Sequence, residues 1–157
     1  MRKHIIDQSQ PIEGLIEPAW LNLEELALVE VSSEAPDYPV EFALLPKHRV
    51  GWQAGRSGMQ CLRLIFDQPQ QLNIIRLSFS EPLLARCQEY CLRWSADIEH
   101  PLQEFIRQQW NFSPTGSTVE REEHLITLAH VKVLELQIIP DIQGGGARAT
   151  LERLQLA

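Results

Sequence analysis

Apolar and polar residues alternate with a period of two along most of the chain from about residue 24 onwards. Successive side chains of a β-strand point to opposite faces of a sheet, so this alternation is typical of strands with one buried face. The sequence has no sustained helical stripe bounded by good capping residues. The pattern therefore predicts an all-β protein and argues against folds built on long helices.

Eight segments carry the alternation, and together they predict an eight-stranded antiparallel β-sandwich of the jelly-roll type. The expected strands cover residues 24–31, 59–66, 72–79, 86–95, 103–109, 119–128, 132–139 and 147–156. Four of them show clearly which face turns inward. The expected core is therefore Leu62, Leu64, Phe66, Ile75, Leu77, Phe79, Tyr90, Leu92, Trp94, Leu134, Leu136 and Ile138.

The chain of 157 residues is long enough for one domain with a sizeable core. We expect a single domain over residues 1–157. The first 22 residues are expected to form an N-terminal extension, in which Leu15, Ile16 and Trp20 pack against the sandwich.

The charge balance argues against several classes of partner. There are 14 Lys and Arg against 21 Asp and Glu, which gives a formal net charge of −7. Such a chain repels phosphate backbones and anionic membranes, so general nucleic-acid binding is disfavoured. No segment resembles a secretory signal or a membrane span. We therefore expect a cytoplasmic protein without a membrane span.

Residue patterns that would support catalysis or metal binding are missing. The glycines at 144–146 lack the flanking residues of a phosphate-binding loop, and no Gly-x-Ser-x-Gly pattern occurs. None of the five histidines forms a pair at metal-ligand spacing, and Cys87-x-x-x-Cys91 has no second pair. With Cys61, the cysteines make an odd set, which favours buried free thiols. The sequence thus predicts neither an enzyme nor a catalytic metal.

The connections of the expected sandwich point to one end as the place of a ligand site. In an antiparallel sandwich alternate connections emerge at the same end, which groups residues 32–58, 80–85, 110–118 and 140–146. The first of these has 27 residues, whereas connections usually have about 4–6. Long loops on a rigid scaffold commonly carry function.

The same loops contain residues suited to sugar recognition, namely Trp52, Arg56, Trp110, Asn111 and Arg148. An aromatic ring can stack on the C–H face of a pyranose, while guanidinium and amide groups hydrogen-bond to its hydroxyls. The alternative is that both tryptophans fold back to fill the end of the sandwich and that Arg56 braces its loop through a salt bridge.

Several segments, taken in order, match a known pattern over residues 23–156. They are Val29-Glu30-Val31-Ser32-Ser33, Gly51-Trp52, residues 60–66, residues 71–77, Tyr90-Cys91-Leu92-Arg93-Trp94-Ser95-Ala96-Asp97, residues 133–138 and residues 149–156. In this order and spacing the chain resembles the discoidin, or coagulation-factor C-type, domain and the related galactose-binding-like carbohydrate-binding modules.

The resemblance implies a galactose-binding-like sandwich that binds ligands without catalysis. Many members of the family hold a structural calcium ion with an Asp-Gly pair in the first long loop and a glutamate of the closing strand. Glu152 matches that glutamate, but residues 40–44 read Val-Glu-Phe-Ala-Leu where Asp-Gly is expected. Calcium needs several oxygen ligands, so this mismatch argues against the structural calcium ion, and we expect no cofactor.

The leading functional hypothesis is a non-catalytic module that binds a carbohydrate or glycoconjugate through residues 32–58, 110–118 and 140–146. In this hypothesis Trp52 or Trp110 stacks on the sugar, while Arg56, Asn111 and Arg148 donate to its hydroxyls. The alternative is an intracellular protein–protein interaction module on the same fold, because a fold does not determine a function. The missing secretory signal and the altered calcium loop favour that alternative.

Overall fold

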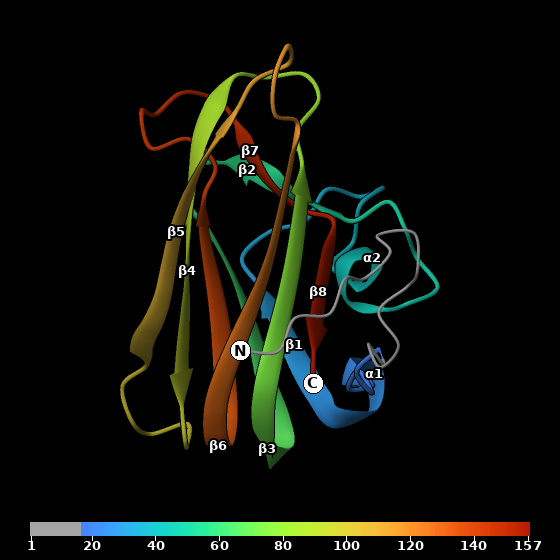
Figure 1. Ribbon diagram of the computed structural model, residues 1–157, viewed down its shortest axis with the longest axis vertical. Helices are drawn as coiled ribbons and strands as arrows, with labels where there is room; N and C mark the ends of the chain where they lie inside the picture. The colour runs from blue at the N-terminus through green and yellow to red at the C-terminus, as the bar shows by residue number, and fades with distance from the viewer. Residues whose placement is uncertain (1–16) are drawn as a thin grey trace, which may run out of the picture.

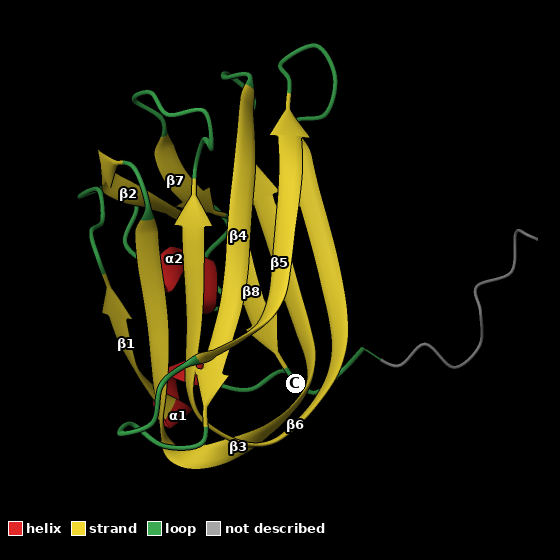
Figure 2. Ribbon diagram, turned by 90° about the vertical axis from the view of Figure 1, so that its left-hand side faces the viewer, coloured by secondary structure: helices red, strands yellow, loops and turns green. Residues whose placement is uncertain are grey.

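Two long strands determine the architecture. β3 (Gln60–Ser80) and β6 (Val119–Ile139) have 21 residues each and pair antiparallel along their length. In the computed structural model, which describes residues 17–157, both strands curve at the lower end of the molecule (Figure 2). Their pairing register shifts between Ile65 and Ile74, and such irregularities let a strand bend.

The bend explains a difference from the sequence prediction. Residues 67–71 and 129–131 were expected to be turns between separate strands, but they lie inside β3 and β6. Pro69 falls in the irregular part of β3, where its missing N–H leaves no regular ladder position unfilled. Each long strand therefore contains two of the expected strands.

The two halves of the long strands belong to opposing layers. The first half of β3 and the second half of β6 lie in the order β1-β3-β6-β4-β5, with β1 spanning Ala27–Val31, β4 Arg86–Ser95 and β5 Gln103–Phe112. The other halves pair with each other, and β8 (Arg153–Leu156) joins them through β3. A separate pair of strands, β2 (Trp52–Ser57) and β7 (Arg148–Leu151), lies at the upper end (Figure 1).

Some predicted strand boundaries were wrong for local reasons. Residues 23–26 form a helical turn, α1 (Leu23–Leu26), with two glutamates in its first turn, where negative charge favours a helix. The strand expected from residue 147 to 156 is divided into β7 and β8 at Glu152, whose N–H donates to the Ser78 carbonyl at 2.9 Å. A second helical turn, α2 (Glu41–Leu44), lies within the long first loop.

The predicted core is confirmed. Eleven of its twelve residues are at most 2% exposed, and Trp94 is half-buried against them. The rings of Phe79 and Tyr90 stack across the two layers with centroids 5.3 Å apart. The all-β sandwich predicted from the alternation is therefore the observed fold.

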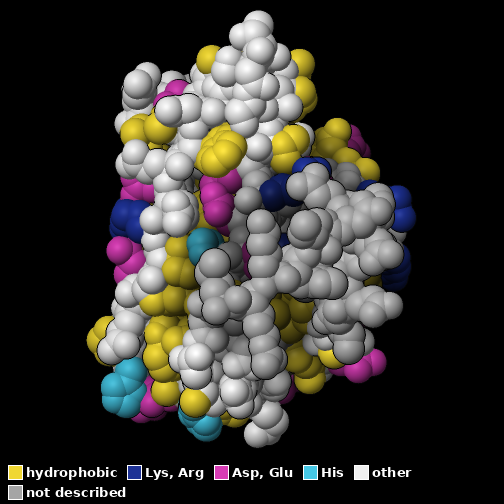
Figure 3. All heavy atoms as spheres, in the orientation of Figure 1, with side chains coloured by type: hydrophobic (Ala, Val, Ile, Leu, Met, Phe, Trp, Pro, Cys, Tyr) yellow, Lys and Arg dark blue, Asp and Glu magenta, His cyan; other side chains and the backbone are white. Residues whose placement is uncertain are grey.

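The predicted grouping of loops is confirmed for three of the four connections, and the fourth, residues 32–58, reaches the same end mainly with its last part, β2 (Figure 1). The connections that follow β3, β5 and β6 emerge together at the upper end, beside β2 and β7 (Figure 1). Hydrophobic side chains also reach the surface at this end (Figure 3). A candidate site is therefore best sought there.

Three further expectations concern the N-terminus, the thiols and the membrane. Leu15 and Ile16 lie outside the described residues, but the Trp20 ring lies 4.6 Å from the Arg76 guanidinium of β3. The three cysteines are free, and Cys91 is buried. None of the helices within residues 17–157 is long and apolar enough to cross a membrane.

Candidate functional site

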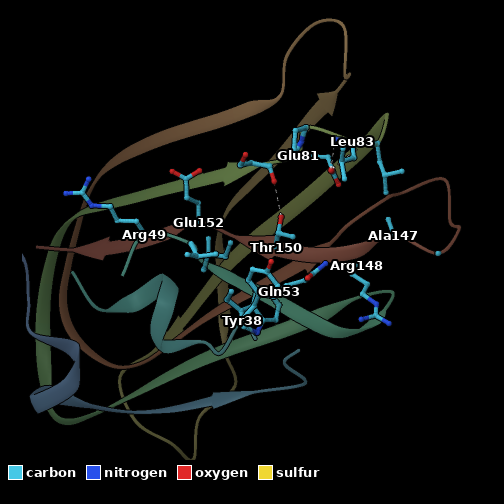
Figure 4. Close-up of a pocket in the computed structure, with 16 residues that line it drawn as sticks. Tyr38, Arg49, Gln53, Glu81, Leu83, Ala147, Arg148, Thr150 and Glu152 are labelled. Atoms are coloured by element: carbon cyan, nitrogen blue, oxygen red, sulfur yellow. Dashed lines mark hydrogen bonds between the residues drawn. The ribbon is translucent and has the colours of Figure 1, made fainter. Parts of the chain in front are cut away.

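A pocket of about 680 Å³ opens at the upper end of the sandwich. It lies between β7, the loop that follows β3 and the segment that leads into β2 (Figure 4). Tyr38, Gln53, Arg148, Thr150 and Glu152 are among its lining residues. Three of the four loop segments grouped by the sequence analysis thus contribute to one pocket.

Strand alternation decides which side chains reach the pocket. β2 and β7 pair antiparallel, with Gln53 opposite Thr150 and Trp52 opposite Leu151. Neighbouring residues of a strand point to opposite faces, so the first pair lies on the pocket side while the second enters the core. The short β2–β7 sheet is therefore both the floor of the pocket and a lid on the core.

A glycine allows the long loop to approach this floor. Gly51 has φ +85°, and a Cβ added to it would lie 2.6 Å from the Leu151 carbonyl oxygen and 2.8 Å from the Glu152 Cα. No other residue type combines this backbone conformation with so close an approach. The turn at Gly51 lets the preceding residues, Arg49 and Val50, line the pocket.

A buried ion pair holds one wall of the pocket. The Arg86 guanidinium donates from Nε to Glu81 Oε1 at 2.8 Å and from Nη1 to the Pro140 carbonyl at 2.8 Å. Glu81 Oε2 accepts the backbone N–H groups of Leu83 and Leu84, which fixes the loop after β3. Because Arg86 also lies over the Phe112 ring at 4.7 Å, it joins three connections of the upper end.

Hydrogen bonds connect Arg86 to further polar side chains inside the core. Arg86 Nη1 donates to Gln88 Oε1 at 3.1 Å, and Gln88 Nε2 donates to Glu120 Oε2 at 3.3 Å. Glu120 is fully buried, and its Oε1 has no hydrogen-bond partner among the described residues. Burial, reinforced by the charge of Glu122, raises the pKa of the Glu120 carboxyl to about 7.

The long first loop is held by an arginine of β8. The Arg153 guanidinium donates to the carbonyl oxygens of Leu45 and His48, which follow α2. These carbonyls lie close after the place where the family pattern has its calcium-binding Asp-Gly. Their lone pairs are directed at a cation that belongs to the chain itself.

The residues present do not fit the structural calcium ion that the resemblance implies. Calcium takes six to eight oxygen ligands, whereas here α2 replaces the Asp-Gly pair and Arg153 binds the loop carbonyls. Among residues 17–157, no three His, Cys, Asp or Glu side chains are grouped so that they could hold a metal ion. Glu152 instead lines the pocket.

This arrangement predicts that Arg153, and not calcium, stabilises the loop. Arg153→Met is expected to lower the free energy of unfolding by about 2 kcal/mol, because two carbonyls lose a charged donor. Millimolar EDTA or calcium chloride is expected to leave the Tm of the unmodified chain unchanged in thermal denaturation.

The matched control is Arg121→Met, because Arg121 is exposed on β6 and forms no ion pair with a described carboxylate. A calcium ion bound to the folded state alone would raise the Tm with its concentration. A Tm that falls in EDTA or rises with calcium would therefore contradict the prediction.

The structure corrects the interpretation of Trp52 as a stacking residue. Its side chain is 2% exposed, and the indole Nε1 donates to the Ser33 carbonyl at 3.1 Å. The segment around Trp52 was predicted to be a glycine-rich loop. It is strand β2, and Trp52 and Ala54 lie on the inward face of this strand. Trp52 therefore fills the end of the core, which was the alternative reading.

The other four predicted residues are not brought together. Arg148 lines the pocket, and Arg56 is exposed on β2 beside Ser57, the partner of Arg148 in the strand pair. Trp110 and Asn111 belong to β5, which extends to residue 112, and neither lines the pocket. Trp110 is half-buried, with Nε1 donating to Ser117 Oγ at 3.2 Å.

Sequence reasoning missed the groups that form most of the pocket. Tyr38, a residue that is 37% exposed, supplies an aromatic ring, and Gln53 and Thr150 supply the paired polar groups of the floor. The alternation in Trp52-Gln53-Ala54 was an available signal. If Trp52 and Ala54 face the core, Gln53 must face the other side of the same strand. Tyr38 carried no signal beyond its place in the long loop.

Two curved layers, a shared core and a pocket on the end loops define the class of protein as a jelly-roll β-sandwich with its candidate binding site at one end. Comparison with solved structures identifies the fold more closely. The chain has the fold of CBM32 modules, which are discoidin-like and galactose-binding-like, and it matches many of them over most of its length.

Three matches illustrate the similarity. The CBM32 of AlyQ, solved with 4,5-unsaturated mannuronic acid, has a TM-score of 0.61 at 13% identity, covering 85% of this chain and 95% of that one. CBM32-3 of a family 31 glycoside hydrolase from Clostridium perfringens gives 0.63 at 15%, covering 87% and 93%. The family 32 module of NanJ from the same organism, solved with galactose, gives 0.60 at 14%, covering 87% and 96%.

No protein-family model matches the chain, and no curated protein matches it in sequence. The similarity to the solved structures is therefore a similarity of fold, and the site must be judged on its own residues.

Proposed function

We propose that this chain is a non-catalytic carbohydrate-binding module whose ligand occupies the end pocket. The observation that carries the proposal is the composition of that pocket, which joins the exposed ring of Tyr38 to the polar side chains of Gln53, Thr150 and Glu152. An aromatic face beside groups that both donate and accept hydrogen bonds suits the two kinds of surface on a pyranose.

Several matched structures support the choice of ligand class. By their descriptions they hold unsaturated mannuronic acid, GalNAc-β-1,3-galactose and galactose. Other matches are parts of larger enzymes, such as a fucosidase of which this fold covers 26%. A module without a catalytic group of its own agrees with both observations.

The experiment is a titration of the isotope-labelled chain with a panel of neutral and acidic oligosaccharides, followed by amide chemical shifts. Shifts are expected at Tyr38, Gln53 and Thr150. Tyr38→Ala is expected to weaken binding about five- to tenfold, because it removes the stacking face.

Asn111→Ala is the matched control, because Asn111 is exposed on β5 but does not line the pocket. It is expected to leave binding unchanged. Shifts confined to β5 and residues 113–118 would move the site away from the pocket, and binding of no saccharide would overturn the proposal.

A second candidate function, a protein–protein interaction module, is favoured by the rim of the pocket. Val50, Leu83 and Leu84 are large apolar residues that are 65%, 79% and 50% exposed. Clustered exposed apolar side chains are typical of surfaces that dock other proteins. Co-purification would separate the two functions, since elution by free sugar supports the first and a stoichiometric protein partner the second.

A further inference from the structure

The arginines of this chain are distributed unevenly between paired and unpaired positions. Of the ten arginines in the described residues, five form ion pairs, namely Arg63, Arg76, Arg86, Arg93 and Arg107. Arg153 is committed to the loop carbonyls. The other four are exposed and form no ion pair with a described carboxylate; they are Arg49, Arg56, Arg121 and Arg148.

Three of these four unpaired arginines lie at the pocket end. Arg49 and Arg148 line the pocket, and Arg56 is on β2 beside the strand partner of Arg148. The chain has a formal net charge of −7, so carboxylates outnumber its bases. Unpaired guanidinium groups gathered at one place on such a protein indicate a site for negative charge that the chain does not itself supply.

The pocket's own acids leave this positive charge largely uncompensated. Glu81 is neutralised by Arg86 at 2.8 Å, and its other oxygen accepts two backbone N–H groups. Glu152 is the other acidic residue that lines the pocket, against the two arginines. At physiological salt charges act over about 8 Å, so these local groups, and not the overall charge, set the potential that a ligand meets.

The two lining arginines do not converge on one point. Arg49 and Arg148 lie on opposite sides of the pocket, with Gln53 and Thr150 between them (Figure 4). A ligand that occupies the floor and reaches both guanidinium groups must therefore carry negative charge at two separated places. A neutral sugar would offer these arginines only hydroxyl acceptors, and not the paired carboxylate or sulfate oxygens that a guanidinium binds in a bidentate manner.

We infer that the ligand is an acidic oligosaccharide, with carboxylate or sulfate groups on at least two sugar units that Arg49 and Arg148 bind on either side of the polar floor. This inference rests on the proposed function and narrows its substrate class. The neutral side chains of Gln53 and Thr150 contact the middle of the ligand. Arg49 and Arg148, on either side of the floor, bind its charged groups.

The test offers the protein linear oligosaccharides in matched forms: polygalacturonate and its methyl ester, polymannuronate and mannan, and a galactan with and without sulfate. Affinity is measured by calorimetry at low and at high salt. The charged member of at least one pair is expected to bind tenfold or more tightly than its neutral partner, and salt should reduce the difference. The carboxylate and sulfate arms show which anion is preferred.

The double variant Arg49→Gln with Arg148→Gln is expected to bind the charged and neutral members equally, because the charged member loses both of its guanidinium partners. Arg121→Gln, which removes an unpaired arginine elsewhere, should change neither. Equal affinity for both members of every pair in the unmodified protein would overturn the inference and leave the proposed function intact. Binding of none of these saccharides would overturn both.

Discussion

Replacing Arg86 with methionine is expected to lower the free energy of unfolding by about 3–5 kcal/mol, measured by urea denaturation at neutral pH. Methionine preserves much of the length of the side chain, so the change mainly removes charge and donors. The Arg86 side chain is 1% exposed and that of Glu81 12% exposed. Removing one member of such a pair leaves the other as a desolvated charge without its partner.

The loss extends beyond the ion pair. Gln88 and the Pro140 carbonyl also accept hydrogen bonds from Arg86, at 3.1 and 2.8 Å, and the guanidinium packs on Phe112. Each buried acceptor that loses its donor adds a desolvation cost. The wall of the pocket is expected to loosen as well, because Glu81 holds the N–H groups of Leu83 and Leu84.

A second substitution tests the cause. Combining Arg86→Met with Glu81→Gln removes the carboxylate that has lost its partner. The free energy of unfolding of the double variant should therefore fall by less than the sum of the two single losses. Arg121→Met is the control for losing an exposed arginine, with an expected change within about 0.5 kcal/mol. An Arg86→Met loss as small as that of the control would show that the buried pair contributes little.

The fold was largely predictable because its main determinant is local. Large apolar residues recur at every second position at Leu62, Leu64 and Phe66, and Leu134, Leu136 and Ile138 alternate with polar residues. Burial of these faces between two layers follows from the hydrophobic effect without knowledge of the topology. The division of the strands was harder, because Asp67-Gln68-Pro69 has the composition of a turn and yet lies within a bent strand.

The candidate site was predicted less well because it depends on contacts between distant residues. The end of the sandwich and Arg148 followed from strand alternation and loop grouping. Gln53 and Thr150 meet only because β2 pairs with β7, almost a hundred residues later in the chain. No local pattern reports such a pairing, and the glycines around Trp52 concealed β2 itself.

The buried hydrogen-bonded residues Arg86, Gln88 and Glu120 were predictable in part. Period two places Arg86 and Gln88 on the same inward face as Tyr90, so polar residues in the core were implied by the pattern. What the pattern could not supply is Glu120, which comes from the opposing layer and meets Gln88 across the sandwich. Polar residues on an inward face therefore indicate a buried hydrogen-bond network. Which residues pair within that network can be identified only from the structure.

Glu120→Gln is expected to remove a fall in stability that the unmodified protein shows as the pH rises towards neutrality. Glu120 is fully buried, and one of its two carboxylate oxygens has no hydrogen-bond partner among the described residues. Burial is the main cause that raises the pKa of this carboxyl to about 7, and the nearby charge of Glu122 adds to it. The hydrogen bond from Gln88 and the charge of Arg86 oppose the shift without cancelling it.

The sign follows from the two states. In the unfolded chain the carboxyl has its ordinary pKa of 4.5, so between that value and about 7 the folded state holds a proton that the unfolded state has lost. The stabilisation from this proton is complete below pH 4.5 and is lost as the pH rises through about 7. A shift of this size corresponds to about 3 kcal/mol.

The measurement is the free energy of unfolding of both proteins from about pH 4.5 to about pH 8, by urea denaturation. Glutamine has the same shape and stays neutral, so the stability of the variant relative to the unmodified protein should rise by about 3 kcal/mol across this range. His124, whose pKa is lowered by burial, titrates in both proteins and cancels in the difference. The control Glu25→Gln changes an exposed carboxylate of α1 and should follow the unmodified protein at every pH. If the Glu120→Gln curve also runs parallel to that of the unmodified protein, Glu120 is charged in the folded state throughout, and a counter-charge must reach it inside the core.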